Sequence, residues 1–340
     1  MAALLEMRQV IHRYNGRTVL DIPSFSIATG TITGLVGPNG SGKTTMLRLL
    51  SLVDSCTSGT ILFRGQPAAP FDDHIRHRIS LLLQTPYLLK RPVYDNIAYG
   101  LKLRKTTDRL EKRVEAALDL VGLPPSFSKR QWHELSGGES QRVALAARLA
   151  LQPDCLFLDE PIASVDPQSA SIIRRAILFA RKEWNTAILV SSHQHPWLRT
   201  FCDRIVDLHH GRIPPYPLQN ILNGPWHYLD NGNVSKILSD GQIITLPAPP
   251  TLHSSAILPP GALTVINGEA DFNAGNILRG KIVSVQVDDE RDDRLNLHIL
   301  CAEQKFILEL SLDDWRARHL QPGQFVPIAV SLPGVVWMPA

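Results

Sequence analysis

The chain has 340 residues, enough for two domains with cores of their own, because a single domain usually has about 100 to 200 residues. Its formal net charge is only +3 and 20% of its residues are charged, which argues against a generic nucleic-acid binder or an acidic tail. Four scattered cysteines without a Cys-x-x-Cys pair suggest neither a disulfide framework nor a zinc site, and they fit a reducing cytosol.

Short apolar runs alternate with stretches of helical period from Leu4 to about Ile213. The apolar runs are TITGLVG, RISLLLQ, CLFLDEP, TAILVSS and RIVDLHH, and the helical stretches include DRLEKRVEAALDLVGL and ESQRVALAARLALQ. This order is typical of an α/β domain with a largely parallel sheet. We therefore predict a first domain over residues 1–213.

The segment GPNGSGKTT follows TITGLV and precedes the helical MLRLLSL, so it matches the G-x-x-x-x-G-K-[ST] phosphate-binding loop in its strand–loop–helix setting. Its glycines let backbone N–H groups surround phosphate oxygens, and the helix N-terminus adds a positive dipole end. Lys43 is expected to reach the β- and γ-phosphates, and Thr44 to ligate Mg²⁺. The predicted nucleotide-binding residues of this loop are Gly37, Pro38, Asn39, Gly40, Ser41, Gly42, Lys43, Thr44 and Thr45.

The segment ELSGGES places Ser136, Gly137 and Gly138 at the start of a helical stretch. By itself it reads as an ordinary helix N-cap, with Ser136 capping and Glu139 three residues on. The same position at a helix N-terminus is also suited to binding an anion. The surrounding motifs must decide between the two interpretations.

The apolar run CLFLDEP ends in two carboxylates, and ligands bind at the carboxyl ends of strands in α/β sheets. We predict that Asp159 holds Mg²⁺ through its water shell and that Glu160 accepts a proton from the attacking water. Two acids that end a strand are otherwise more often a solvated turn. The phosphate-binding loop upstream favours the chemical interpretation.

Three prolines in IPPYPLQN interrupt both helix and strand, so we predict a linker over residues 214–224. Residues 225–340 then lose helical period, which predicts a small all-β domain, a barrel or a sandwich. Its strands and turns are indicated by KIVSVQV (Val283, Val285, Val287), LNLHI (Leu295, Leu297, Ile299) and the dipeptides Asn231-Gly232, Asp240-Gly241 and Asn267-Gly268.

The segments GPNGSGKTT, LSGGESQR, CLFLDEP, ASVDP and SSH, with a loop at Gln84, occur in chain order and resemble the complete motif set of the ATP-binding-cassette (ABC) ATPases. The resemblance spans residues 4–211 and implies that the chain uses ATP and Mg²⁺. It also implies a homodimer in which two chains associate head to tail. Each chain would then present Ser136, Gly137 and Gly138 to the γ-phosphate of the ATP that the other chain holds.

The same resemblance implies roles for further residues. Tyr14 would stack on adenine, the alternative being a half-buried strand tyrosine. Asp166 would lie at the dimer seam, although ASVDP differs from the more common Ser-Ala-Leu-Asp of the family. The implied catalytic residues are Glu160, His193, which would contact the γ-phosphate, and Gln84, which would contact Mg²⁺ and the attacking water. The implied metal-binding residues are Thr44, Gln84 and Asp159.

Other members of this family act on DNA ends, chromosomes or ribosomes. Chromosome-type members insert long coiled coils between the phosphate loop and LSGGE, but here only residues 45–135 separate the two motifs, without sustained heptads. The segment TPYLLKRPVYDNIAYGLKL resembles the importer surface that receives a helix of the membrane subunit; the alternative is a helical subdomain that packs on itself. We therefore predict an importer ATPase without a nucleic-acid partner.

The sequence has no signal-peptide pattern and no run of about 18 uncharged apolar residues, so we do not expect the chain to cross a membrane by itself. The resemblance then implies that the permease consists of separate transmembrane subunits and that an external substrate-binding protein completes the complex. The chain is expected as a peripheral subunit on the cytoplasmic face of the inner membrane.

The segment NAGNILRGKIVSV resembles the opening signature of molybdate-binding (TOBE-like) barrels. It keeps Asn276 and Gly280 but has Asn273 and Gly275 where that signature often has serine and arginine. The resemblance to such accessory β-domains of importer ATPases implies a regulatory or dimerisation role for the predicted all-β domain. An oxyanion such as molybdate or tungstate is the predicted cargo, and sulfate, iron, sugar or polyamine are the alternatives. Arg279 and Lys281 are candidate anion donors or, alternatively, solvated charges on a strand edge.

Overall fold

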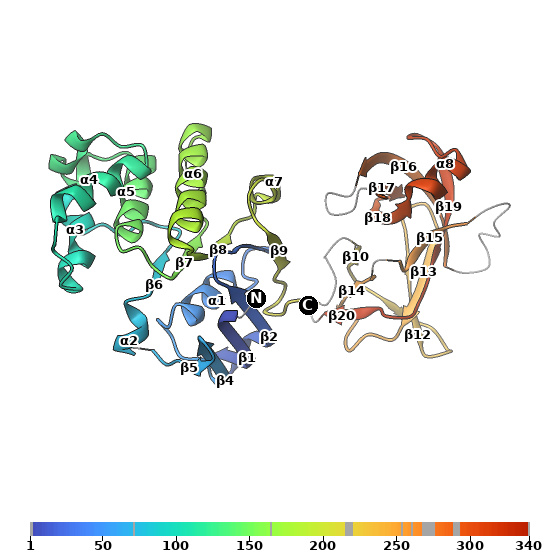
Figure 1. Cartoon of the computed structure of the whole chain (residues 1–340). Helices are drawn as coiled ribbons and strands as arrows, with labels where there is room; N and C mark the ends of the chain where they lie inside the picture. Colours follow the sequence, from blue (N-terminus) through green and yellow to red (C-terminus); the bar gives the residue numbers. More distant parts are fainter. Residues whose placement is uncertain are drawn as a thin grey trace. The chain divides into compact units, whose positions relative to one another are not determined.

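The computed structural model describes residues 3–70, 72–163, 165–214, 220–252, 254–259, 261–266, 276–287 and 293–338. The chain divides into two compact units, Met1–Ile213 and Pro214–Ala340 (Figure 1). The buried apolar side chains of the first unit form two clusters, and those of the second unit form a separate one. Among the described residues, no helix is both long and apolar enough to span a membrane.

A five-stranded parallel sheet forms the centre of the first unit. Its order is β6-β7-β8-β3-β9, and every neighbouring pair is parallel. The strands are β3 (Ile32–Val36), β6 (Ile79–Leu82), β7 (Cys155–Asp159), β8 (Ala187–Ser191) and β9 (Arg204–Asp207). Strands β3, β7 and β8 are buried along their whole length, which explains their unbroken apolar sequence. The predicted α/β fold is confirmed, and all five strands end at the same edge.

The first unit also contains an antiparallel sheet that was not predicted. Its order is β2-β1-β4-β5, formed by β1 (Ala3–Tyr14), β2 (Arg17–Ala28), β4 (Ser58–Phe63) and β5 (Gln66–Pro67). Asn15 and Gly16 join β1 to β2 with φ angles of 48° and 80°, and such a pair is typical of a type I′ hairpin turn. This Asn-Gly dipeptide is the sequence signal that could have revealed the hairpin. Helix α1 (Lys43–Leu50) shares a core with side chains of both sheets.

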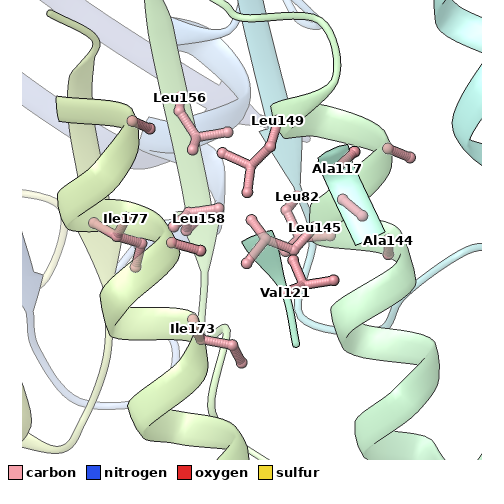
Figure 2. Close-up of a cluster of buried hydrophobic side chains, with 14 of the residues drawn as sticks. Leu82, Ala117, Val121, Ala144, Leu145, Leu149, Leu156, Leu158, Ile173 and Ile177 are labelled. Carbon is pink, nitrogen blue, oxygen red and sulfur yellow. The ribbon is translucent and has the colours of Figure 1, made fainter. Parts of the chain in front are cut away.

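A helical subdomain packs against strands β6 and β7. It contains α3 (Val93–Leu103), α4 (Leu110–Leu120), α5 (Gly137–Leu149) and the short 3-10 helices Pro125–Lys129 and Trp132–Glu134. In Figure 2, Leu145 and Leu149 of α5 point toward Leu82, Leu156 and Leu158. Ile173 and Ile177 of α6 (Pro167–Trp184) belong to the same core. The other helices of this unit are α2 (Asp73–Arg76) and α7 (His195–Arg199).

The second unit, in its described residues, is all β apart from the short helix α8 (Leu312–Arg318). Its sheets are β10-β14-β20, β11-β12-β13 and β15-β19-β16-β17-β18, which confirms the predicted barrel-like all-β region. The strands are β10 (Ile221–Leu222), β11 (His227–Tyr228), β12 (Asn233–Ile237), β13 (Ile243–Pro247), β14 (Ser255–Ile257), β15 (Leu263–Val265), β16 (Ile277–Val287), β17 (Arg294–Cys301), β18 (Gln304–Ser311), β19 (Phe325–Val330) and β20 (Val336–Met338).

The two-residue period predicts β17 better than β16. Leu295, Leu297 and Ile299 of β17 are all buried, as expected for one face of a strand. In β16 the ladder with β17 has a bulge between Ile282 and Ser284, so Val283 is exposed whereas Val285 packs on the core. The turns at Asn231-Gly232 and Asp240-Gly241 precede β12 and β13, and Asn267-Gly268 lies outside the described residues.

The end of the predicted linker, residues 214–224, belongs to the second unit. Ile221 and Leu222 form β10, which pairs with β14, and Leu222 is fully buried. The side-chain amide of Asn220 donates to Ile307 O at 2.8 Å and accepts from Ile307 N at 2.7 Å. The proline count could not show that backbone pairing resumes at residue 221.

Candidate nucleotide-binding and catalytic site

The phosphate-binding loop connects the end of β3 to the start of α1, as its motif predicts. Gly37 has a φ of 154°, and a Cβ added there would lie 2.1 Å from Leu208 O. Gly42 has a φ of 103° and precedes Lys43, the first residue of α1. Both glycines are therefore required by the close approach of neighbouring backbone or by a left-handed conformation.

The side chains of Lys43 and Ser41 place polar groups within this loop. The Lys43 ammonium donates to Gly37 O at 2.8 Å and to Pro38 O at 3.2 Å. The Ser41 hydroxyl is buried and has no partner within the described chain. Asn39 and Gly40 are exposed, and a Cβ at Gly40 would meet no atom within 4 Å. A buried cation, an unpartnered hydroxyl and open space above the loop fit a phosphate group.

Two hydroxyl groups hold the first carboxylate at the end of β7. Thr44 Oγ1 donates to Asp159 Oδ2 at 2.6 Å, and Ser191 Oγ donates to Asp159 Oδ1 at 2.6 Å. Ser191 Oγ also accepts the backbone N–H of Glu160 at 3.0 Å. Hydroxyl and carboxylate oxygens are the ligands that Mg²⁺ prefers, so Thr44 and Asp159 fit the predicted metal. Sequence reasoning missed Ser191, although it is the first serine of the SSH segment.

Glu160 and His193 form a contact across neighbouring strand ends. His193 Nδ1 lies 3.0 Å from Glu160 Oε2, and the His193 backbone N–H donates to the same oxygen at 3.4 Å. The Glu160 side chain is 8% exposed, whereas that of His193 is 59% exposed. Glu160 also has a φ of 46°, a strained value for this residue type that is often found at functional sites. The Glu160 carboxylate is thus held in one orientation at the sheet edge.

Gln84 and Tyr14 form no hydrogen bond with these groups among the described residues. Gln84 is exposed and follows the end of β6 by two residues, next to β7 in the sheet. Tyr14 ends β1, and its side chain is 47% exposed. Its ring packs edge-on against buried His12, with the ring centroids 4.6 Å apart. Gln84 and part of Tyr14 are therefore exposed to solvent.

The start of α5 forms a separate polar group. Ser136 accepts the Glu139 N–H at 3.3 Å, and Glu139 accepts the Ser136 N–H at 2.8 Å, a reciprocal capping box. This Ser136 N–H bond holds the pKa of the Glu139 carboxyl below its usual value. The cap predicted for Ser136 is therefore present.

Asp166 lies next to the start of α5. It caps α6 by accepting the Ser169 N–H at 2.9 Å and the Ser169 hydroxyl at 2.7 Å, which lowers the pKa of its carboxyl. A Cβ at Gly138 would lie 3.9 Å from Asp166 Oδ2. Ser164 of the same segment lies outside the described residues.

Within the described residues, no hydrogen bond joins residues 136–138 to the phosphate-binding loop. Figure 1 shows α5 apart from α1. One chain therefore brings together the phosphate loop, Asp159, Glu160 and His193, and keeps Ser136, Gly137 and Gly138 elsewhere.

A strand–phosphate loop–helix unit beside paired carboxylates defines a phosphate-loop ATPase. The family model for the ABC transporter matches residues 20–163. The tungstate uptake system ATP-binding protein TupC of Peptoclostridium acidaminophilum is 40% identical over 201 residues, which are 59% of this chain and 92% of TupC. The chain belongs to the ABC transporter family, as one of its ATPases.

Two further comparisons agree with this assignment. The Fe(3+) ions import ATP-binding protein FbpC 2 of Pectobacterium atrosepticum is 35% identical, over 62% of this chain and 61% of that protein. The solved structure of the ATP-binding cassette MJ0796, a dimer bound to ADP and Pi, is 25% identical with a TM-score of 0.58, and covers 62% of this chain and 96% of that chain.

Replacement of Ser191 by alanine tests the hydroxyl bridge. Ser191→Ala removes the donor to buried Asp159, and we expect it to lower the free energy of unfolding by about 1–3 kcal/mol and to reduce ATP hydrolysis. Ser192→Ala is the matched control, because Ser192 is also buried but its hydroxyl accepts only from Gln194 N, at 3.1 Å. Urea unfolding and phosphate release measure both effects. Full turnover in Ser191→Ala would show that the bridge does not orient the carboxylate.

Proposed function

We propose that the protein is the ATP-hydrolysing subunit of an importer, with Glu160 as the general base. The contact of Glu160 with His193 beside the phosphate loop carries this proposal. Oε2 of Glu160 is engaged by His193, so Oε1 is the oxygen that would receive a proton. The water oxygen forms a bond to the γ-phosphorus, the bond from that phosphorus to ADP breaks, and one water proton passes to Glu160.

The other residues of the edge would hold the substrate. The phosphate-binding loop, residues 37–45, would bind the phosphates through its backbone N–H groups, which Pro38 alone lacks, and through Lys43, and Tyr14 would stack on adenine. Thr44, Asp159 and Gln84 would hold Mg²⁺, which when bound neutralises charge on the β- and γ-phosphates. Thr44 and Asp159 are supported by their 2.6 Å contact, and Gln84 by its place two residues beyond β6.

We propose further that two copies complete each other's sites through Ser136, Gly137, Gly138 and Asp166. Within the described chain, residues 136–138 form no hydrogen bond with their own phosphate loop, which supports this arrangement. A Cβ at Gly137 would meet no atom within 4 Å, so a second molecule can approach closely. The similar cassette MJ0796 was solved as a dimer.

The partners would be separate transmembrane permease subunits and an external substrate-binding protein. The names of the relatives, an uptake protein for tungstate and an import protein for Fe(3+), support an importer located on the cytoplasmic face of the membrane. Exposed apolar side chains in the segment after Gln84 offer a surface for a membrane subunit: Tyr87, three residues on, is 82% exposed, and Leu103 at the end of α3 is 59% exposed.

For the cargo we propose an oxyanion such as tungstate or molybdate, because TupC is 40% identical. Relatives named for iron, spermidine/putrescine and sulfate/thiosulfate support the alternatives. Residues 225–340 would serve as a TOBE-like dimerisation or regulatory domain. Arg279 stacks over Phe325 at 4.7 Å, and Lys281 is exposed on the same strand. Gly275, the third candidate donor, lies outside the described residues.

Glu160→Gln tests the general base. The amide keeps the shape of the carboxylate but cannot accept the proton, so ATP turnover should fall by about 10²- to 10⁴-fold. ATP binding should persist and the ATP-bound dimer should accumulate, as measured by phosphate release and light scattering. Glu115→Gln is the matched control, because Glu115 is an exposed carboxylate on α4 that lies outside the proposed site. Near-normal ATP hydrolysis by Glu160→Gln would contradict the assignment of Glu160 as the general base.

Mixing two inactive variants tests the shared site. Lys43→Ala should weaken nucleotide binding in its own chain, and Ser136→Arg should block the site of the partner. A mixed dimer has one intact composite site and one doubly broken site, so part of the ATPase activity should return relative to either variant alone. Absence of nucleotide-promoted dimers, with or without the permease, contradicts the proposal.

The cargo is tested with the substrate-binding protein encoded beside this chain's permease. Calorimetric titration of that protein should show tighter binding of tungstate or molybdate than of sulfate, Fe³⁺ or spermidine. Preference for Fe³⁺ or spermidine would replace the oxyanion proposal and leave the ATPase assignment intact.

A further inference from the structure

A tight turn follows β9 and reaches the back of the phosphate-binding loop. We name residues 208–212 the rear turn. His209 N donates to Arg212 O at 2.9 Å, and Arg212 N donates to His209 O at 3.0 Å. The two residues between them, His210 and Gly211, have φ angles of 45° and 76°, as in a type I′ turn. The turn is therefore a compact unit closed by its own hydrogen bonds.

The rear turn contacts the phosphate-binding loop at two points. Leu208 N donates to Val36 O at 2.8 Å, and Leu208 O occupies the place of a Gly37 Cβ. Gly211 N donates to Ser41 O at 2.9 Å. The contacts thus hold the first residue of the loop and the residue four positions later.

The other side of the rear turn is fixed to β2. Asp21 N donates to Gly211 O at 2.8 Å, and the Arg212 guanidinium pairs with Asp21 Oδ2 at 2.7 Å. A Cβ at Gly211 would lie 2.1 Å from Val19 O, so the turn fills the space between β2 and the loop without room for a side chain. Movement of the turn is restricted from both sides.

We propose that the rear turn holds the phosphate-binding loop in the shape that binds ATP, a role that rests on the ATPase function proposed above. A loop that offers N–H groups to phosphate has few of them left to stabilise itself, and within the described chain the loop has one such internal bond, from Ser41 N to Pro38 O at 3.2 Å. Its shape must therefore be fixed largely by contacts with neighbouring backbone. Pro38, Asn39 and Gly40 are exposed, and the rear turn pins the loop on either side of them. Gly211 and Leu208 are positioning residues that act through Ser41 and Gly37.

A matched pair of glycine substitutions tests this role in the full chain. Gly211 and Gly65 have φ angles of 76° and 77°, but a Cβ at Gly65 would meet no atom within 4 Å. Alanine should therefore strain both backbones equally, but only Gly211→Ala collides with neighbouring backbone, at Val19 O of β2. That collision displaces the turn and weakens the bond from its N–H to Ser41 O. We expect Gly211→Ala to raise the Kd and KM for ATP about 3- to 10-fold, the factor for one lost hydrogen bond. Equal Kd values in folded Gly211→Ala and Gly65→Ala overturn the proposal.

Hydrogen exchange of the unmodified protein gives an independent test if Gly211→Ala does not fold. Nucleotide bound at residues 37–45 should also slow exchange of the Gly211 amide, because coupling between the loop and the turn is reciprocal. Protection of residues 37–45 with unchanged exchange in residues 208–212 overturns the positioning role. Absence of protection in both segments contradicts nucleotide binding itself, so the two failures are distinguishable.

Discussion

The common direction of five parallel strands is the constraint on which the rest of the site depends. Because β6, β7, β8, β3 and β9 run the same way, the residues that follow each strand emerge at one edge. The register places Asp159 of β7 beside Ser191 of β8, and Ser191 beside Leu35 of β3. The phosphate loop, the carboxylates and His193 therefore converge although they are far apart in the sequence. The same constraint brings the rear turn after β9 to the back of the loop.

The burial of charge at this edge explains why the site is suited to its ligand. Lys43, Asp159 and Glu160 are all buried, and a buried charge costs free energy unless a partner offsets it. Two hydroxyls hold Asp159 and a histidine contacts Glu160, but among the described residues Lys43 contacts only carbonyl oxygens. Phosphate would supply the missing negative charge. Nucleotide should therefore stabilise the first unit as well as bind to it.

Local sequence patterns predicted the secondary-structure elements better than they predicted the contacts between those elements. The apolar runs gave the five parallel strands, because burial on both faces leaves an unbroken apolar sequence. The antiparallel hairpin was missed although Asn15-Gly16 marks its turn, and the bulge at Val283 has no signature in a two-residue period. Ser191 and Gly211 matter through partners distant in sequence, Asp159 and Ser41. Identifying their roles required the strand register and the path of the backbone, and neither can be derived from composition or periodicity.

The start of α5 shows how one local structure supports two interpretations. Its capping box uses the N–H groups of Ser136 and Glu139, and Ser140 N donates to Ser136 O. Within the described chain, the N–H groups of Gly137 and Gly138 then have no hydrogen-bond acceptor. The cap therefore orders the helix end and leaves two N–H groups at its positive dipole end for an anion. Since the phosphate loop of the same chain lies elsewhere, a second copy is the arrangement that would use them.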